Sequence, residues 1–203
     1  ELIDDATGQA STLDLTIGNG ATFVMRNFSS STPLHFDTFE IALGGTVTHH
    51  ENDAGDEPRQ MVYIQADDIA IADGGLIDVS GKGFYGGSGG GKGYGPGKGE
   101  FAYATAVGAG HGGDGTANFS DGTSAGPGGG AYCDVSNPGT LGSGGSSGVF
   151  DGATGRPGGS GGGLVWLMAS SSINLNGDIF ADGEDGSYDF YTGDITFESI
   201  SGA

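Results

Sequence analysis

The sequence predicts an all-β protein with essentially no α-helix: a β-solenoid-like stack of strands, or alternatively a β-sandwich, that carries a glycine-rich insert. Short runs of alternating β-branched or aromatic and small polar residues, separated by glycine turns, are typical of strands. Glycine accounts for 46 of the 203 residues, and each glycine inside a helix costs about 1 kcal/mol relative to alanine. No stretch has the 3.6-residue apolar period that would offset this cost.

A strand, a tight turn and a second strand recur four times in the flanks. The four turns are Gly18-Asn19-Gly20, Gly44-Gly45, Asp73-Gly74-Gly75 and Asn176-Gly177, each preceded and followed by apolar alternation. The last two units match over a longer span, because residues 61–66 (MVYIQA) parallel residues 164–169 (LVWLMA). An interrupted internal repeat suits a solenoid, in which each rung stacks on the one before. A β-sandwich of hairpins stays open, since glycine turns also suit hairpin loops.

We expect a single domain over residues 1–203, β-rich over 1–80 and 164–203, with the insert at 81–163. The insert contains 33 of the 46 glycines. Within it glycine recurs at every third position, as at Gly139, Gly142, Gly145 and Gly148, at Gly152, Gly155, Gly158 and Gly161, and at Gly83, Gly86 and Gly89. A polyproline-II-type helix has three residues per turn, so this spacing predicts packed polyglycine helices that hydrogen-bond to one another. Irregular but ordered loops are the alternative, and the periodicity argues against a flexible linker.

Five blocks stand out between residues 61 and 186: residues 108–115 (GAGHGGDG), 128–134 (GGGAYCD), 141–145 (LGSGG), 161–167 (GGGLVWL) and 176–177 (NG). Together they resemble glycine-rich modules of large extracellular surface and fibre proteins of bacteria and protists. Cys133 departs from this pattern, which has glycine there. The resemblance implies a cell-surface, fibre or adhesive role, and polyglycine sandwiches are similarly found in phage tail-tip adhesins.

The charge of the chain excludes several classes of partner. With 26 acidic and 6 basic residues the net charge is −20, which opposes binding to nucleic acid or to anionic membranes. No run of 18 apolar residues is present, so we expect no membrane insertion. The chain begins at Glu1 without a signal-like apolar stretch, and we expect a secreted, extracellular or cell-surface protein whose signal peptide has been removed. Its one cysteine, Cys133, is expected to be a buried or half-buried thiol.

The sequence predicts a protein that is not an enzyme. Asp67-Asp68 and the Gly110-His111-Gly112 triplet superficially match part of a polyuronide-cleaving pattern, but the basic residues that should follow are missing. Six bases scattered through the chain offer no cluster for a lyase reaction.

No cofactor is expected beyond weakly bound calcium. Asp182, Glu184 and Asp185 are the weak calcium candidates, with a second short acidic turn at residues 53–57. A solvated acidic surface explains the same residues without an ion. His49 and His50 beside Glu51 suggest a transition-metal pair, but adjacent strand residues point to opposite faces.

We expect a structural subunit of a self-assembling cell-surface filament or coat, present as a homo-oligomer or filament. Terminal segments would satisfy the open strand edges, with Leu2, Ile3, Ile195, Phe197 and Ile200 as the predicted assembly residues.

The alternative function is an adhesin or receptor-binding module that recognises surface glycans, with Tyr94 and Tyr103 as contacts. Aromatic residues of this kind also cap a core. Asn27 and Asn118 begin glycosylation sequons.

Overall fold

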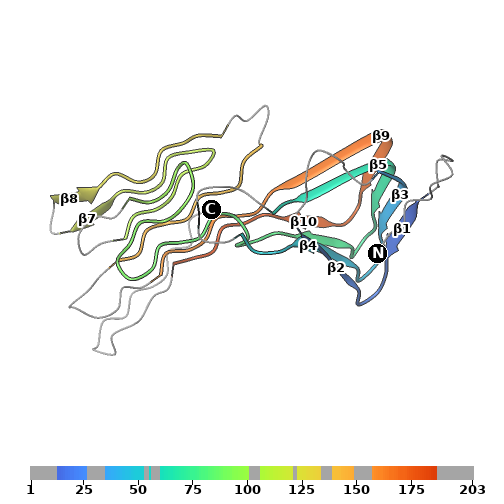
Figure 1. The fold of residues 1–203 in the computed structure, drawn as a ribbon, viewed down its shortest axis with the longest axis horizontal. Helices are drawn as coiled ribbons and strands as arrows, with labels where there is room; N and C mark the ends of the chain where they lie inside the picture. The colour runs from blue at the N-terminus through green and yellow to red at the C-terminus, as the bar shows by residue number, and fades with distance from the viewer. Residues whose placement is uncertain are drawn as a thin grey trace.

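The computed structural model describes residues 13–26, 35–52, 55, 60–100, 106–120, 123–133, 139–148 and 157–186. Ten strands and no helix are found in these ranges, which confirms the all-β prediction. The strand-rich part and the glycine-rich insert follow one another along the longest axis of the molecule (Figure 1).

Two four-stranded sheets form the strand-rich part. Sheet 1 has the order β1 (Asp14–Ile17), β3 (His35–Ile41), β5 (Val62–Ile71), β9 (Val165–Leu175). Sheet 2 has the order β2 (Thr22–Met25), β4 (Thr46–His49), β6 (Leu76–Asp78), β10 (Asp178–Phe180). Every pair in both sheets is parallel. A separate antiparallel pair, β7 (Asn118–Ser120) and β8 (Thr123–Gly126), lies in the insert.

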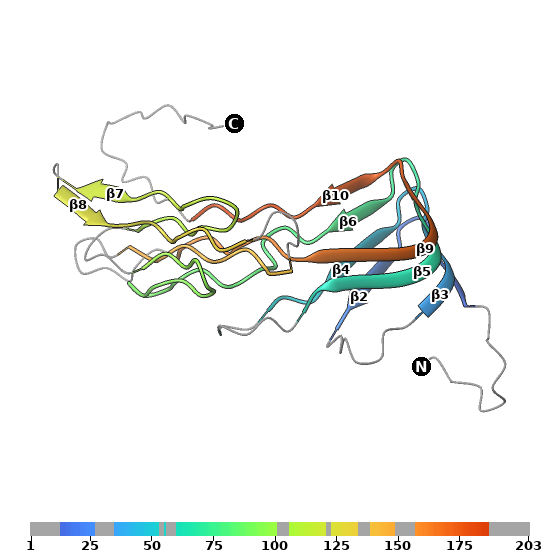
Figure 2. The ribbon, with the colours of Figure 1, turned by 90° about the horizontal axis from the view of Figure 1, so that it is seen from above.

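Each strand–turn–strand unit contributes one strand to each sheet, and we call such a unit a rung. Rungs 1 to 4 are β1–β2, β3–β4, β5–β6 and β9–β10. Figure 2 looks down on rung 4, where β9 and β10 diverge from the turn that joins them. The two strands of a rung therefore do not pair with each other as in a hairpin; each pairs with the matching strand of the next rung.

The predicted repeat is confirmed by the register between β5 and β9. Val62 pairs with Val165, and the pairing continues through Ala66 with Ala169. The register then shifts, so that Asp68 pairs with Ser172 and the longer β9 accommodates one extra residue. Two segments separated by the whole insert thus pair residue by residue.

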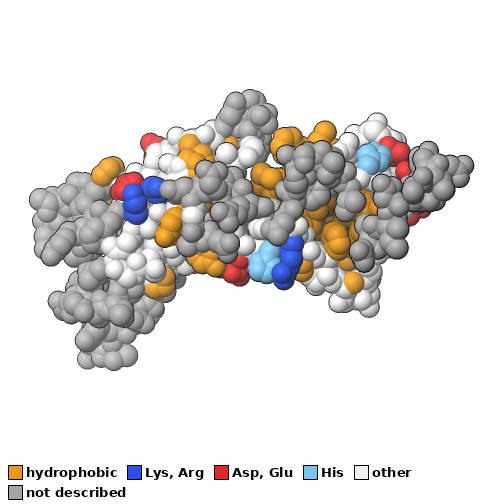
Figure 3. All heavy atoms as spheres, in the orientation of Figure 1, with side chains coloured by type: hydrophobic (Ala, Val, Ile, Leu, Met, Phe, Trp, Pro, Cys, Tyr) orange, Lys and Arg blue, Asp and Glu red, His pale blue; other side chains and the backbone are white. Residues whose placement is uncertain are grey.

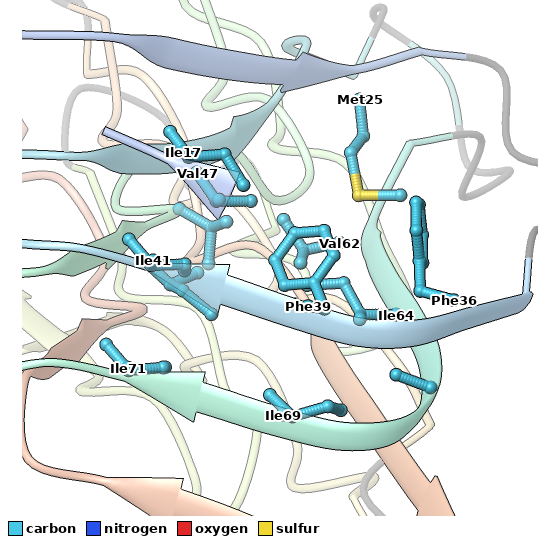
Figure 4. Packing of buried hydrophobic residues seen from close by; sticks show 13 residues of the cluster. Ile17, Met25, Phe36, Phe39, Ile41, Val47, Val62, Ile64, Ile69 and Ile71 are labelled. Carbon is cyan, nitrogen blue, oxygen red and sulfur yellow. The ribbon is translucent and has the colours of Figure 1, made fainter. Parts of the chain in front are cut away.

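Three apolar ladders run through the rungs, and their members in rungs 1 to 3 form the core between the sheets; Figure 4 shows the buried ones. The ladders are Leu15, Phe39, Ile69 and Ile173; Ile17, Ile41, Ile71 and Leu175; and Phe23, Val47, Ile77 and Ile179. Phe36 packs edge-on against Phe39, with ring centroids 5.2 Å apart. Because strand side chains alternate, each rung supplies inward residues to the core and outward residues to the surface.

The turns of successive rungs stack on one another. Gly20, Gly44 and Gly74 each have φ near +75°, which favours glycine. The Gly20 N–H donates to the Gly44 carbonyl at 3.0 Å, and the Gly44 N–H donates to the Gly74 carbonyl at 2.9 Å. Leu43, which the sequence places in the apolar alternation before the turn, lies in the turn itself and is 68 % exposed. Its side chain lies beside Gly74, whose missing Cβ leaves room for it.

Three stretches of the insert are joined by backbone hydrogen bonds that recur every third residue. The Phe84 and Gly87 N–H groups donate to the carbonyls of Gly142 and Gly145, at 2.9 and 2.8 Å. Bonds to the third stretch repeat likewise: Gly142 to Gly162, Gly145 to Gly159, Gly161 to Phe84 and Gly158 to Gly87. Each stretch thus donates to or accepts from both of the others, and the backbone satisfies its own polar groups.

Glycine is required here because the backbones approach too closely for side chains. A Cβ on Gly161 would fall on the Gly142 carbonyl, and one on Gly86 would fall on the Gly158 carbonyl. A small buried apolar cluster of Phe84, Leu141 and Leu164 accompanies these hydrogen-bonded stretches.

We expect Gly161→Ala to lower the free energy of unfolding by about 2 kcal/mol, because the added methyl group must push two backbones apart. Gly113→Ala is the matched control, since nothing lies within 4 Å of the position its Cβ would take. Denaturant unfolding of both variants measures the difference. Equal stability of the two would contradict the close-packed arrangement.

Candidate functional site

The unusual surface of the molecule is the outer side of rung 4. Ile173, Leu175 and Ile179 are 45, 51 and 38 % exposed. Their ladder partners one rung below, Ile69, Ile71 and Ile77, are at most 1 % exposed. These three rung 4 residues therefore point toward the core space but have nothing stacked above them among the described residues.

The strand edges at rung 4 also have no neighbouring strand among the described residues. β9 and β10 are the last strands in the order of their sheets, so no described strand pairs with their outer edges. An edge of this kind presents backbone N–H and C=O groups that can pair with another strand. Figure 3 shows hydrophobic side chains along the upper border of the strand-rich part, where Figure 1 places β9 and β5. The open edge and the exposed apolar residues together form the candidate site, which we call the open end.

On the outer face of sheet 1, polar side chains of paired residues form hydrogen bonds between neighbouring strands. The Ser172 hydroxyl donates to Asp68 Oδ1 at 2.6 Å, across the β5–β9 pair. Hydrogen bonds from Ser172 and Ser171 hold the pKa of the Asp68 carboxyl below its usual value. The Thr16 hydroxyl makes a similar cross-strand bond to Glu40 at 3.4 Å. Hydroxyl-to-carboxylate pairs between rungs are thus a feature of sheet 1.

Rung 1, at the opposite end of the stack, exposes less apolar surface. Ile17 and Met25 are 4 and 7 % exposed, and Leu15 and Phe23 are half-buried. The outward residues Asp14, Thr16 and Thr22 are exposed. The two ends therefore differ: one has exposed core positions, the other a polar outer row with apolar residues beneath.

The predicted binding and assembly residues lie mostly beyond the described part of the chain. Tyr103, Leu2, Ile3, Ile195, Phe197 and Ile200 are outside the described residues. Tyr94 is described and is partly buried against the cluster of Phe84, Leu141 and Leu164. Its position matches an aromatic residue that caps a core, which is the simpler of the two interpretations offered by the sequence.

The calcium candidates do not converge. Asp182, Glu184 and Asp185 lie exposed in the segment after β10. The Glu184 side chain instead lies beside Gly81. The backbone N–H of Glu184 donates to the Ser160 carbonyl at 2.8 Å. Within the described ranges no three His, Cys, Asp or Glu side chains gather as metal ligands would. Of the second acidic turn, Asp53, Asp56 and Glu57 lie outside the described residues.

The two adjacent histidines differ in burial, as alternation along a strand predicts. His49 is fully buried between the sheets, whereas His50 is exposed. The His49 Nδ1 atom lies 2.7 Å from the His50 carbonyl oxygen. Its Nε2 atom has no hydrogen-bond partner and lies beside Gly163, at the point where the insert returns to the core. Burial lowers the pKa of the His49 imidazole, and the nearby positive charge of Lys82 lowers it further.

The residues of the polyuronide-type pattern are dispersed. Asp67 and Asp68 lie on β5, where Asp67 is within 3.5 Å of His35. His111 lies in the insert, with its ring edge-on to Tyr132 at 5.1 Å and its Nε2 atom 3.1 Å from the Thr140 carbonyl oxygen. The structure describes two of the three remaining candidates, the cysteine and one of the two sequon asparagines. Cys133 is half-buried, Asn118 begins β7, and Asn27 lies outside the described residues.

No protein-family model, no curated protein and no solved structure matches the chain. None of the residues described belongs to a helix with the length and apolar character needed to cross a membrane.

The sequence predicts open strand edges but does not show where they lie. It places Ile173, Leu175 and Ile179 in the apolar alternation around the Asn176-Gly177 turn, but they are exposed because no described residues stack above them. The available signal was that they belong to the last of the four matching units.

We expect His49 to make stability fall with decreasing pH. Its folded pKa is lowered, so below about pH 6.5 the unfolded chain binds a proton that the folded chain does not. The loss approaches about 1.4 kcal/mol per pH unit until the folded pKa is reached.

Denaturant unfolding between pH 7.5 and 5.5 tests this against His49→Met, which suits the ladder because Met25 occupies the same place in rung 1. The variant should lack this component of the pH dependence, while the exposed-site control His50→Asn should keep it. The same pH slope in wild type and His49→Met would contradict the assignment.

Proposed function

We propose that the protein is a non-enzymatic, extracellular structural subunit whose copies stack end to end into a cell-surface filament or coat. One observation carries the proposal: three core-ladder residues of rung 4 are exposed, whereas the same positions one rung below are buried. Burying these side chains beneath another rung would contribute roughly 1 kcal/mol each at half exposure. New backbone hydrogen bonds along the strand edges would add to this.

The same proposal includes a finer description of the fold. We infer that the rungs are coils of a β-solenoid, and the parallel pairing of matching strands from rung to rung supports this. We infer further that the insert is a bundle of polyglycine-type helices. The three-residue recurrence of its hydrogen bonds supports that reading, since such helices have three residues per turn.

A second copy of the chain has the residues needed to cover rung 4. The next rung must place apolar side chains over Ile173, Leu175 and Ile179. Rung 1 carries Leu15, Ile17 and Phe23 at the start of the same three ladders. Rung 1 of one copy on rung 4 of another would therefore continue all three ladders across the joint.

The outward residues also match across such a joint. Asp14 would take the place over Ser172 that Asp68 takes beneath it, and could accept a hydrogen bond from the same kind of hydroxyl. The remaining pairs would be Asn174 with Thr16, Asp178 with Thr22, and Phe180 with Val24. Both acids would face hydroxyl groups, so no like charges would meet. Because the two ends differ, the contact is heterologous. Copies that continue the ladders in line do not close into a ring, so repeated contacts of this kind produce a fibre.

An extracellular location belongs to the proposal as well. The net charge of −20 favours solubility and disfavours nucleic acid as a partner. The likeness of the glycine-rich blocks to surface and fibre proteins points the same way.

We expect Ile173→Asp to abolish assembly, because it places a charge at the apolar centre of the joint. Ala117→Asp is the control, since it adds the same charge at an exposed position of the insert, outside the joint. Electron microscopy and sedimentation of the purified proteins measure assembly. Filaments from Ile173→Asp, or only single particles from the wild type, would contradict the proposal.

The register of the joint can be tested by crosslinking. In a Cys133→Ser background, Asp14→Cys combined with Ser172→Cys should yield disulfide-linked multimers on oxidation. Directly paired strand residues lie within the range of a disulfide, since strands are about 4.8 Å apart. Thr16→Cys with Ser172→Cys is the control, offset by two residues and so by about 7 Å. Equal crosslinking of both pairs, or none of either, would contradict this register.

A further inference from the structure

An exposed aromatic group lies on the outer face of sheet 1, apart from the core-ladder positions of the open end. Tyr63, Trp166 and Met168 point outward, because Val62, Ile64, Val165 and Leu167 beside them point to the core. Trp166 is 44 % and Met168 is 41 % exposed. The rings of Tyr63 and Trp166 meet edge to face with centroids 5.7 Å apart, and the Tyr63 hydroxyl donates to Met168 Sδ at 3.2 Å. We call these three residues the aromatic platform.

Polar side chains border the platform along the same face. Gln65 follows Tyr63 in the outward row, and His35 of β3 pairs with Gln65 in register. The Asp67 carboxylate is next, with Oδ1 3.5 Å from His35 Nε2 and 2.5 Å from the Ser170 hydroxyl. The side chains of His35 and Asp67 remain 45 and 49 % exposed. Amide, carboxylate, imidazole and hydroxyl groups are thus available beside an exposed indole.

We propose that this surface binds an uncharged glycan. A sugar ring has an apolar face of C–H groups that stacks on an aromatic ring, and a rim of hydroxyl groups that needs donors and acceptors beside that ring. Trp166 supplies the stacking surface, and Gln65, Asp67 and His35 supply the polar contacts. The net charge of −20 repels anionic polysaccharides, so the ligand class is neutral oligosaccharides.

The platform is compatible with the proposed assembly and does not depend on it. A joint between rung 4 and rung 1 pairs residues 172–175 with residues 14–17, by the register of the ladders. Trp166 and Met168 precede that stretch and point sideways from the sheet. Each copy in a filament would therefore display one platform, and repeated platforms would strengthen binding to a surface that carries many glycans.

Trp166 is the only tryptophan in the chain, so its fluorescence reports on the site directly. We expect a saturable change in emission when cellohexaose, mannohexaose or chitohexaose is titrated into the protein, for at least one of the three. Heparin hexasaccharide serves as the anionic probe and should produce no change. Silence toward all three neutral probes, or a response to heparin alone, would overturn the proposal.

Variants then locate the binding. Trp166→Ala should weaken binding of the responding probe at least about tenfold by calorimetry, whereas Trp166→Phe should retain most of it. Leu43→Ala, which shortens a 68 % exposed side chain in the turn between β3 and β4, is the control and should bind as the wild type does. Melting curves of each variant establish that the fold is kept. Unchanged affinity of a folded Trp166→Ala protein would overturn the proposal.

The non-assembling variant Ile173→Asp separates this proposal from the proposed function. It should bind the probe with the affinity of a single wild-type subunit, because its platform is intact. Loss of glycan binding together with assembly would show that the platform is not an independent site and would overturn the inference. Glycan binding by a wild-type protein that forms no filaments would leave the platform standing and refute only the filament.

Discussion

The parallel, in-register stacking of the rungs is the constraint on which the rest of the structure depends. A single rung has two short strands that do not pair with each other, so it can neither complete its backbone hydrogen bonds nor bury its inward side chains alone. Phe39 and Ile41 are fully buried because rungs 1 and 3 lie on either side of them. The same rule makes Ile173 and Leu175 exposed, since rung 4 has a described neighbour on one side only. The open end is thus a consequence of the architecture.

The insert is held together mainly by its own backbone hydrogen bonds. Its stretches carry few apolar side chains, and their cohesion comes from N–H to carbonyl bonds that need the close approach glycine permits. The two parts meet at Gly163, where the returning chain passes the buried His49 side chain. A Cβ on Gly163 would strike the imidazole, so the path of the chain into β9 depends on a glycine at this position. The core of the strand-rich part and the returning chain of the insert are therefore in direct contact at this glycine.

Much of the fold was predictable because strand periodicity and internal repetition are local in sequence. Aligning residues 61–66 with 164–169 even places Tyr63 beside Trp166, although the sequence alone did not single out that pair. Other features depend on context that no local pattern contains. Leu43 continues an apolar alternation yet lies in a turn, because the chain must cross from sheet 1 to sheet 2 there. For Tyr94 the sequence left a glycan contact and a core cap both open, and the folding of the insert packs it against the cluster of Phe84, Leu141 and Leu164.

Alternation along β9 divides its side chains between two surfaces of different character. Leu167 points to the core while Trp166 and Met168 point outward, and further along the strand Ile173 and Leu175 lie in the core ladders. A one-residue slip in the β5–β9 register would exchange the two sets, exposing core residues and burying the platform. The register shift after Ala66 prevents this, because it absorbs the extra residue of β9 and returns Ile173 to its place above Ile69. The same strand pairing therefore determines which side chains of β9 stabilise the stack and which are available for binding on the outer face of sheet 1.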